Sequence, residues 1–354
     1  MNKKHLQTFT GAGSPKSGGR QRPTIRDVAA LARVSVTTVS RVINDEPGVS
    51  ARLAARVGDA IERLNYRHNL TASSLRRADG RSATIGLVLE YIANPFDSML
   101  HHAIEEFALK RGVLVLGGSV EEDEVREREL IAALASRRVD GLLIMPAAHD
   151  HSYLLNERSA GTPVVFLDRP PAFFDADTVM TDNLEGVRRG VRHLTSHGHR
   201  RIGYIGDLES ITTATLRLQG YRDELQAQRI AVDEGLIRMN VRGHERGEAA
   251  ALDLLRRNPA PTAIFAAQNL LATGAYRALR RLNLHRKVAL IGFDEIPYAD
   301  LVEPGITVMA QDPVAMGRAA AHLLFRRIDG DRSPSVHEVI PTRLIARGSG
   351  EIRP

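Results

Sequence analysis

Residues 24–77 read TIRDVAALARVSVTTVSRVINDEPGVSARLAARVGDAIERLNYRHNLTASSLRR, and this stretch predicts short helices separated by tight turns. Thr24, followed three residues later by the acid Asp27, is typical of a helix N-terminus. The apolar residues that should form the buried stripe of this first helix are Val28, Ala29, Leu31 and Ala32.

Two further helices follow the first one closely. Ser35 is the expected N-cap of a helix over Val36–Ile43, and Ser50 is that of a helix over Ala51–Leu64, because apolar residues recur in both at helical spacing. Three short helices with a tight first turn are typical of a helix-turn-helix fold. A small helical bundle without a role on DNA is the alternative.

The second helix favours the DNA-binding interpretation. Val36, Thr37 and Arg41 occupy its first two turns and are not needed for the core. A recognition helix presents such side chains to base edges in the major groove of DNA.

Positive charge is concentrated at the start of the chain. Residues 1–80 contain 14 Lys and Arg against 6 Asp and Glu, whereas residues 81–354 contain 34 against 36. A small basic segment on a near-neutral body favours a polyanion-binding module fused to a second function, with a solubilising tail as the alternative. Residues 1–23 are rich in Gly, Ser, Lys and Arg, so we expect a disordered basic arm there.

From Thr84 onward, short apolar runs alternate with helical stretches, a pattern that predicts buried parallel strands in two doubly wound α/β lobes. The expected strands lie at 85–89, 113–116, 141–145, 164–167, 202–205, 263–266 and 288–293. Ligands of such sheets bind beyond the carboxyl ends of the strands. The polar residues at those ends are Asn94, Asp168, Arg169, Asp207, Gln268, Asn269 and Asp294.

Composition excludes several classes of protein. The chain has no cysteine, which excludes a disulfide scaffold, a zinc finger, an iron–sulfur site and a thiol nucleophile. Its apolar runs are shorter than the ~18 residues of a membrane-spanning helix, and its first 23 residues lack the apolar core of a signal peptide. We therefore expect a protein that is neither membrane-integral nor exported.

Neither a metal nor a cofactor is expected. The pairs His197 with His199 and His101 with His102 lack a third placed ligand. The sequence has no dinucleotide-binding glycine pattern after the strand at 113–116 and no nucleophile-elbow motif, so we expect no enzymatic activity.

The quoted stretch closely resembles the headpiece of the lactose-repressor/galactose-repressor (LacI/GalR) family, and the resemblance covers residues 24–349. Similar body segments are NPF at 94–96, VDGLLIMP at 139–146, VVFLDRP at 164–170, HLTSHGHRRIGYIG at 193–206, RLQGY at 217–221, VALIGFDE at 288–295 and PTRLIARGS at 341–349. The resemblance implies an all-α helix-turn-helix headpiece and an α/β core of two doubly wound lobes, similar to periplasmic sugar-binding proteins.

The same resemblance implies a function. The chain should be a cytoplasmic, nucleoid-associated homodimer that binds double-stranded operator DNA, most simply as a repressor. A small sugar-like effector between the lobes should change operator affinity. The implied divisions are a headpiece at 24–67, a hinge helix and linker at 68–80, and a core at 81–354. In the core, the N-lobe comprises 81–181 and 312–337, and the C-lobe comprises 182–311 and 338–354.

Residue roles on DNA follow from the resemblance. Val36 and Thr37 match the base-reading pair of the recognition helix, and Arg41 matches a further DNA contact. Polar groups near helix N-termini hold phosphates. The residues expected to do so are Ser35, Thr38 and Ser40, and Thr24 is a further expected DNA contact. For Ser35, a simple N-cap is the alternative, and both roles are compatible.

The hinge helix is matched by residues 69–76. Its expected DNA contacts are Asn69, Ala72, Leu75 and Arg76. Leu75 matches a leucine that wedges into the minor groove, which partly unstacks a base step and bends the duplex. Many relatives have proline where this chain has His68, so the joint before the hinge lacks the stiffness of a fixed φ.

In the cleft, Arg217 matches the family's ligand-binding arginine, Asp294 matches an aspartate that accepts hydroxyls, and Phe96 offers an apolar face. Weaker candidates by alignment are Asp168, Thr213, Gln268 and Gln311. An interlobe salt bridge is the alternative role for Arg217. Gln268 and Asn269 stand where many relatives have Asn-Asp, so one carboxylate is missing from that loop.

Two other functions are alternatives to that of a regulator. A soluble sugar-binding receptor for a transporter would need an export signal and no headpiece. A sugar-phosphate-processing enzyme would need a general base or a phosphate loop in the cleft, and the sequence offers no convincing one.

Overall fold

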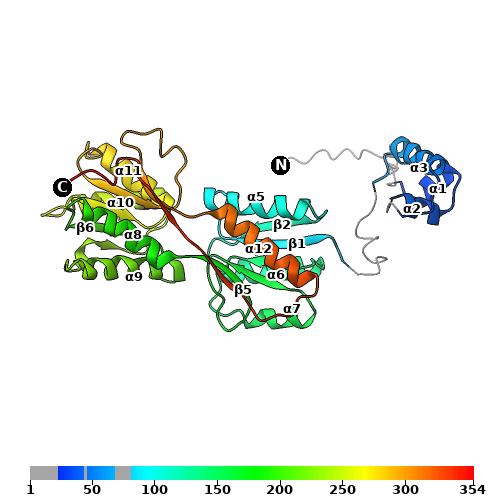
Figure 1. The fold of residues 1–354 in the computed structure, drawn as a ribbon, viewed down its shortest axis with the longest axis horizontal. Coiled ribbons are helices and arrows are strands. Elements are labelled where there is room, and N and C mark those ends of the chain that lie inside the picture. The colour runs from blue at the N-terminus through cyan, green and yellow to red at the C-terminus, as the bar shows by residue number, and fades with distance from the viewer. Residues whose placement is uncertain (1–22, 44–45, 68–80) are drawn as a thin grey trace, which may run out of the picture. The chain divides into compact units, whose positions relative to one another are not determined.

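The computed structural model describes residues 23–43, 46–67 and 81–354, and the chain divides into two units, residues 1–80 and 81–354 (Figure 1). The boundary between the units agrees with the predicted start of the core. Most of the predicted basic arm and the whole hinge, with Asn69, Ala72, Leu75 and Arg76, lie outside the described residues.

The first unit contains the three predicted helices, α1 (Ile25–Ala32), α2 (Val36–Ile43) and α3 (Ala51–Leu64). The backbone N–H of Thr24 donates to Asp27 Oδ2 at 2.7 Å, as the predicted cap requires. Ser35 Oγ accepts from the Thr38 N–H at 3.1 Å and so caps α2. These local hydrogen bonds satisfy donors that a helix start leaves unpaired.

The headpiece core is small. Its fully buried residues are Val28, Ala29, Ala32, Val39, Val57 and Ala60. The prediction that Leu31 belongs to the buried stripe is wrong, because its side chain is 42% exposed. At roughly 100° per residue, Leu31 lies about a third of a turn from the centre of the stripe formed by its buried neighbours.

The second unit contains two six-stranded sheets with the same strand order, β11-β5-β4-β3-β1-β2 and β12-β10-β9-β8-β6-β7. The first sheet consists of β1 (Thr84–Leu89), β2 (Leu114–Ser119), β3 (Leu142–Ile144), β4 (Val164–Leu167), β5 (Asp177–Thr181) and β11 (His337–Ile340). The second consists of β6 (Ile202–Ile205), β7 (Ile237–Arg238), β8 (Ala263–Ala266), β9 (Ala289–Phe293), β10 (Thr307–Ala310) and β12 (Arg343–Ile345). The predicted pair of doubly wound lobes is confirmed.

Helices cover both faces of each sheet. The N-lobe has α5 (Pro95–Leu109), α6 (Glu124–Ser136), the short η1 (Ser152–Leu154), α7 (Leu155–Ser159) and α12 (Pro313–Ile328). The C-lobe has α8 (Asn183–Ser196), α9 (Thr212–Ala227), the short η2 (Glu234–Leu236), α10 (Gly243–Leu255) and α11 (Asn269–Arg281). Neighbouring residues of β1 are buried on opposite faces of the sheet. Leu87 packs with α5 and α12, and Val88 packs with α6. Burial on both faces explains the continuous apolar runs.

The chain crosses between the lobes three times. The crossings after β5 and after β10 agree with the predicted lobe boundaries, but the third boundary, at 337/338, is wrong. β11 pairs in parallel with β5 as far as Ile340 opposite Thr181, so residues 338–340 belong to the N-lobe. Its side chains alternate between exposed and half-buried, which is typical of an edge strand and provides no continuous apolar run.

Candidate functional site

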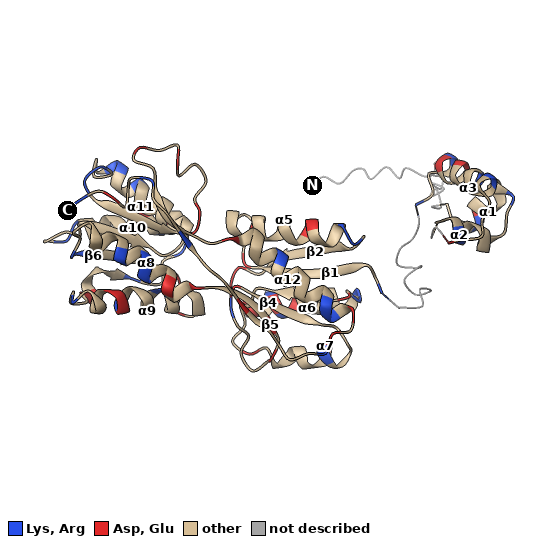
Figure 2. Ribbon diagram, in the orientation of Figure 1, with Lys and Arg blue, Asp and Glu red and all other residues tan. Residues whose placement is uncertain are grey.

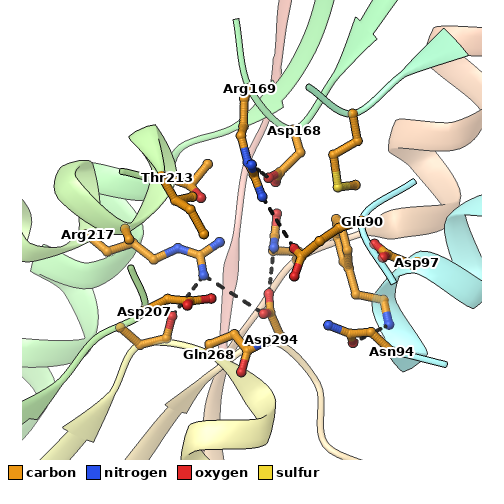
Figure 3. Close-up of a pocket in the computed structure, with 16 residues that line it drawn as sticks. Glu90, Asn94, Asp97, Asp168, Arg169, Asp207, Thr213, Arg217, Gln268 and Asp294 are labelled. Carbon is orange, nitrogen blue, oxygen red and sulfur yellow. Dashed lines mark hydrogen bonds and ion pairs between the residues drawn. The ribbon is translucent and has the colours of Figure 1, made fainter. Parts of the chain in front are cut away.

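A pocket lies between the lobes at the carboxyl ends of the strands (Figure 3). Its lining residues are Glu90, Asn94, Phe96, Asp97, Met145, Asp168, Arg169, Asp207, Ile211, Thr213, Ala214, Arg217, Ala267, Gln268, Asp294 and Gln311. The structure thus brings all seven predicted cleft residues to one pocket. Phe96 and Thr213 reach it from the first turns of α5 and α9.

Asp168 and Asp294 occupy the same position in the two lobes. Each directly follows a central strand, β4 or β9, and each has a left-handed backbone, with φ of 64° and 71°. Their N–H groups donate to the next strand in the same way, to Val179 and Met309, both at 2.9 Å. Aspartate tolerates left-handed φ better than most residues do. The duplicated fold therefore places two buried carboxylates in one pocket.

Arg217 is held in place by several groups of the C-lobe. Its Nε donates to Asn183 Oδ1 at 2.7 Å, and its Nη1 donates to the Ala267 carbonyl at 2.8 Å and lies 4.0 Å from Asp294 Oδ2. The guanidinium also covers the Phe293 ring, 3.9 Å from its centroid. All of these partners are in the C-lobe. The alternative role of an interlobe salt bridge is therefore wrong.

The position of Arg217 depends on a close helix contact. A Cβ at Gly220, one turn later in α9, would lie 2.3 Å from the backbone oxygen of Leu184 in α8. Only glycine permits this approach, which brings Arg217 next to Asn183 at the start of α8.

Two buried acceptors of the pocket have no hydrogen-bond partner among the described residues. They are Asp168 Oδ1 and Gln311 Oε1. The amide of Gln311 is oriented by its Nε2, which donates to Asp294 Oδ1 at 2.5 Å and leaves Oε1 unpaired. Buried polar atoms are normally paired, so these acceptors are suited to N–H or O–H donors of a ligand.

Gln268 has a second role that its alignment position does not reveal. It is the N-cap of α11, and its Oε1 accepts from the N–H groups of Leu270 and Leu271 at 3.0 and 3.3 Å. The adjacent Asn269 donates from Nδ2 to Asn94 Oδ1 at 2.8 Å, which links the two lobes. The Gln268-Asn269 pair thus caps a helix and joins the lobes.

An ion-pair cluster beside the pocket was not predicted as part of the site. Arg242, just before α10, donates to Glu90 Oε1 of the N-lobe at 2.5 Å and to Asp207 Oδ1 of the C-lobe at 3.2 Å. Arg169 binds Glu90 and Glu122 from the other side. Asp207 and Arg169 are among the polar residues predicted at strand ends, but the sequence did not indicate a role for them. Arg242 is not among these residues.

Burial raises the pKa of the Glu90 carboxyl from its usual 4.5 to about 7, against the opposing effect of Arg169 and Arg242. Between these pH values, Glu90 therefore stays largely protonated in the folded chain, whereas it is largely ionised in the unfolded chain. The free energy of unfolding should therefore fall by up to about 3 kcal/mol as the pH rises from 4.5 to 7.

Glu90→Gln should flatten this pH dependence, since an amide does not titrate. Melting temperatures of both proteins between pH 4.5 and 8 measure the effect, and the difference between the two curves isolates Glu90 from other titrating groups. Parallel curves would contradict the prediction.

In the headpiece, the predicted base-reading residues are accessible. Val36, Thr37 and Arg41 are exposed on α2, whereas Val39 of the same helix is fully buried. Arg41 Nε lies 3.8 Å from Glu46 Oε2 across an exposed ion pair, which is weak. Arginine residues occur on all three headpiece helices (Figure 2). Of the expected phosphate contacts, Thr24 and Ser35 are exposed, and Thr38 and Ser40 are half-buried.

His197 and His199 make hydrogen bonds within the C-lobe. His199 is buried, and its ring nitrogens contact Thr262 Oγ1 and the Ile352 carbonyl, so its role is to fix the C-terminal segment. Within the described residues, no group of three His, Asp or Glu is arranged to hold a metal ion. Nor does that part of the chain contain a helix long and apolar enough to cross a membrane.

Comparisons with known proteins match both units. Residues 24–69 match the family model of bacterial regulatory proteins, lacI family, and residues 191–350 match the periplasmic binding protein-like domain. The HTH-type transcriptional regulator GalR of Escherichia coli (strain K12) is 32% identical over 92% of this chain and 95% of that protein.

Two solved structures resemble the whole chain. A transcriptional regulator CelR–cellobiose complex is 33% identical, with a TM-score of 0.69 over 93% of this chain and 100% of that chain. The Lac repressor dimer bound to operator and the anti-inducer ONPF is 26% identical, with a TM-score of 0.82 over 93% of this chain and 99% of that one.

Proposed function

The chain belongs to the lacI family of bacterial regulatory proteins, and we propose that it is a repressor whose affinity for operator DNA is changed by a sugar-class effector bound between its two lobes. The observation that carries this proposal is the polar interlobe pocket with its two unpaired buried acceptors. The similarity to a regulator solved with cellobiose supports a sugar as the class of effector.

An effector in this pocket contacts both lobes. Phe96 and Asp168 belong to the N-lobe, whereas Arg217 and Asp294 belong to the C-lobe. A ligand that bridges the lobes binds one lobe arrangement better than another, and only such a difference shifts a population. We infer that the lobe arrangement sets the spacing of two hinge segments, residues 69–76, in a dimer on DNA.

A homodimer is the proposed assembly, because a two-fold operator is read by two headpieces held together. Exposed apolar side chains near the N-lobe edge strand β2 and helix α5 support it. They are Tyr91, Ile92, Met99, Leu109, Leu114 and Leu116. The dimeric Lac repressor is a structural neighbour. Because operator DNA is the proposed partner, we infer that the protein acts in the cytoplasm, at the nucleoid.

The sugar-binding receptor stays the second candidate, supported by the match of the core to the periplasmic binding protein-like domain. The lacI-family match of residues 24–69 favours the regulator. Because its family is one of regulators, the chain is not an enzyme.

Selection of bound duplexes from a random pool should return an inverted repeat, because two copies read two half-sites. Sedimentation at micromolar concentration should show two chains per selected duplex. A stable monomer on the selected DNA would contradict the dimer, and a lack of sequence enrichment would contradict the regulator.

A further inference from the structure

We propose that the effector carries a protonated amine beside its hydroxyls, so that the pocket prefers an amino sugar over the neutral sugar and excludes sugar acids and sugar phosphates. This inference rests on the proposed function and specifies the chemical class of the ligand.

The pocket has an excess of carboxylates. Five acidic side chains line it, namely Glu90, Asp97, Asp168, Asp207 and Asp294. Two basic side chains, Arg169 and Arg217, line it as well. Just outside the lining, Arg242 and Glu122 add one charge of each sign to the same network. Including this pair therefore does not change the excess of acidic over basic side chains.

The arginines in and beside the pocket already form ion pairs with particular acidic side chains. Arg217 faces Asp294 in the C-lobe, Arg169 binds Glu90 and Glu122, and Arg242 binds Glu90 and Asp207. Asp97 and Asp168 of the N-lobe have the fewest contacts with basic side chains. The Tyr91 backbone N–H donates to Asp97 Oδ2 at 2.7 Å, and Asp168 Oδ2 lies 3.4 Å from Arg169 Nε.

Asp168 contributes a carboxylate oxygen that is left without a partner in the described part of the chain. Its side chain is more than nine-tenths buried, and its Oδ1 lines the pocket without a partner among the described residues. Its charge acts on both walls, because it raises the pKa of Asp97 in the N-lobe and that of Asp294 in the C-lobe, in each case in addition to the larger effect of burial. Figure 3 shows Asp168, Asp97 and Glu90 around the same space.

An ammonium group meets these requirements better than a hydroxyl does. It has three donors, no acceptor and a positive charge, whereas a hydroxyl is neutral and brings acceptor lone pairs. A hydroxyl that donates to the Asp168 carboxylate already makes a charge-assisted hydrogen bond, but an ammonium adds a positive charge on the donor and so forms an ion pair as well. A ligand carboxylate or phosphate would instead bring a negative group to the buried Asp168 Oδ1, an acceptor that needs a donor. A metal ion is disfavoured, since the described acids are not arranged as a metal-binding group.

The first test is calorimetric titration of the full-length protein with matched sugars. The panel contains glucose, galactose, ribose and cellobiose, together with the 2-amino, N-acetylamino and acid or phosphate derivatives of the same skeletons. The amino member of the best-bound skeleton should bind at least tenfold tighter than its neutral parent. N-acetylation, which removes the charge, should abolish that gain, and the anionic members should not bind measurably.

The outcomes separate this inference from the proposed function. If a neutral or anionic sugar binds as tightly as its amino counterpart and changes operator affinity, the inference fails and the proposed function stands. If no member of any charge class binds, the sugar-effector function fails and the inference with it.

The second test is Asp168→Asn, a substitution that keeps the size of the side chain and its tolerance of left-handed φ. The ratio of the amine's affinity to that of the neutral parent should fall toward one, whatever the substitution does to the affinity of the neutral parent. Asp150→Asn, at an exposed aspartate outside the pocket, is the matched control and should keep the preference. A full amine preference in Asp168→Asn would overturn the proposed position of the ammonium.

Discussion

Arg217→Ala should bind operator as the wild-type protein does but lose its response to effector. The headpiece that reads DNA is a separate unit, so its helices are unchanged by this substitution. In the pocket, the substitution removes a fixed guanidinium. A hydrogen bond to a charged group contributes about 1.5–3 kcal/mol, so effector affinity should fall by roughly 10- to 150-fold. The core should also lose stability, because Asp294 is left buried without its countercharge.

Operator binding, measured by fluorescence anisotropy with increasing effector, separates the two effects. Arg222→Ala is the matched control, because Arg222 lies on the same helix in an exposed pair with Glu234. It should respond as the wild type does. If Arg217→Ala still responds at wild-type effector concentrations, the assigned cleft contact is wrong.

Substituting Val36 and Thr37 should change which operators are bound. Their side chains are exposed at the start of α2 and contribute little to the headpiece core, so the fold should survive. Each good base contact that is lost should cost about 1–3 kcal/mol of discrimination on the cognate half-site. The double substitution should therefore reduce specific affinity by roughly 30- to 25,000-fold, which corresponds to about 2–6 kcal/mol.

Affinities for the cognate duplex and for a scrambled duplex, measured at several salt concentrations, test this assignment. The variant should keep the wild-type salt dependence, since that slope reports phosphate contacts. An equal loss on both duplexes would show that the two residues position the helix and do not read bases.

Coupling between the two sites is reciprocal, which connects these experiments. If effector weakens operator binding by some factor, operator must weaken effector binding by the same factor. The interlobe contacts of Arg242 with Glu90 and of Asn269 with Asn94 stabilise the described lobe arrangement. An effector in the adjacent pocket therefore acts on a set of lobe contacts that is already formed.

Local sequence determined much of the fold. The bounds of α2 and α3 follow from their serine caps and apolar spacing, because a short helix depends on interactions within a few residues. Strands β4, β6 and β8 match their predicted bounds, since burial on both faces requires continuous apolar runs. The predicted runs did not include strands β5, β7, β10, β11 and β12. For the edge strands β7, β11 and β12 the reason is that an edge strand needs no continuous apolar run.

For the site, sequence predicted the individual residues and the tertiary structure decided their relations. The motif match and the strand-end rule identified all seven cleft candidates. They did not reveal that Arg217 is committed within the C-lobe, that Gln268 caps a helix, or that Arg242 joins the lobes. Nor did they show that Asp97 and Asp168 are buried with too few cations. Burial and ion pairing depend on residues far apart in the chain, and only the packing of the two lobes brings those residues together.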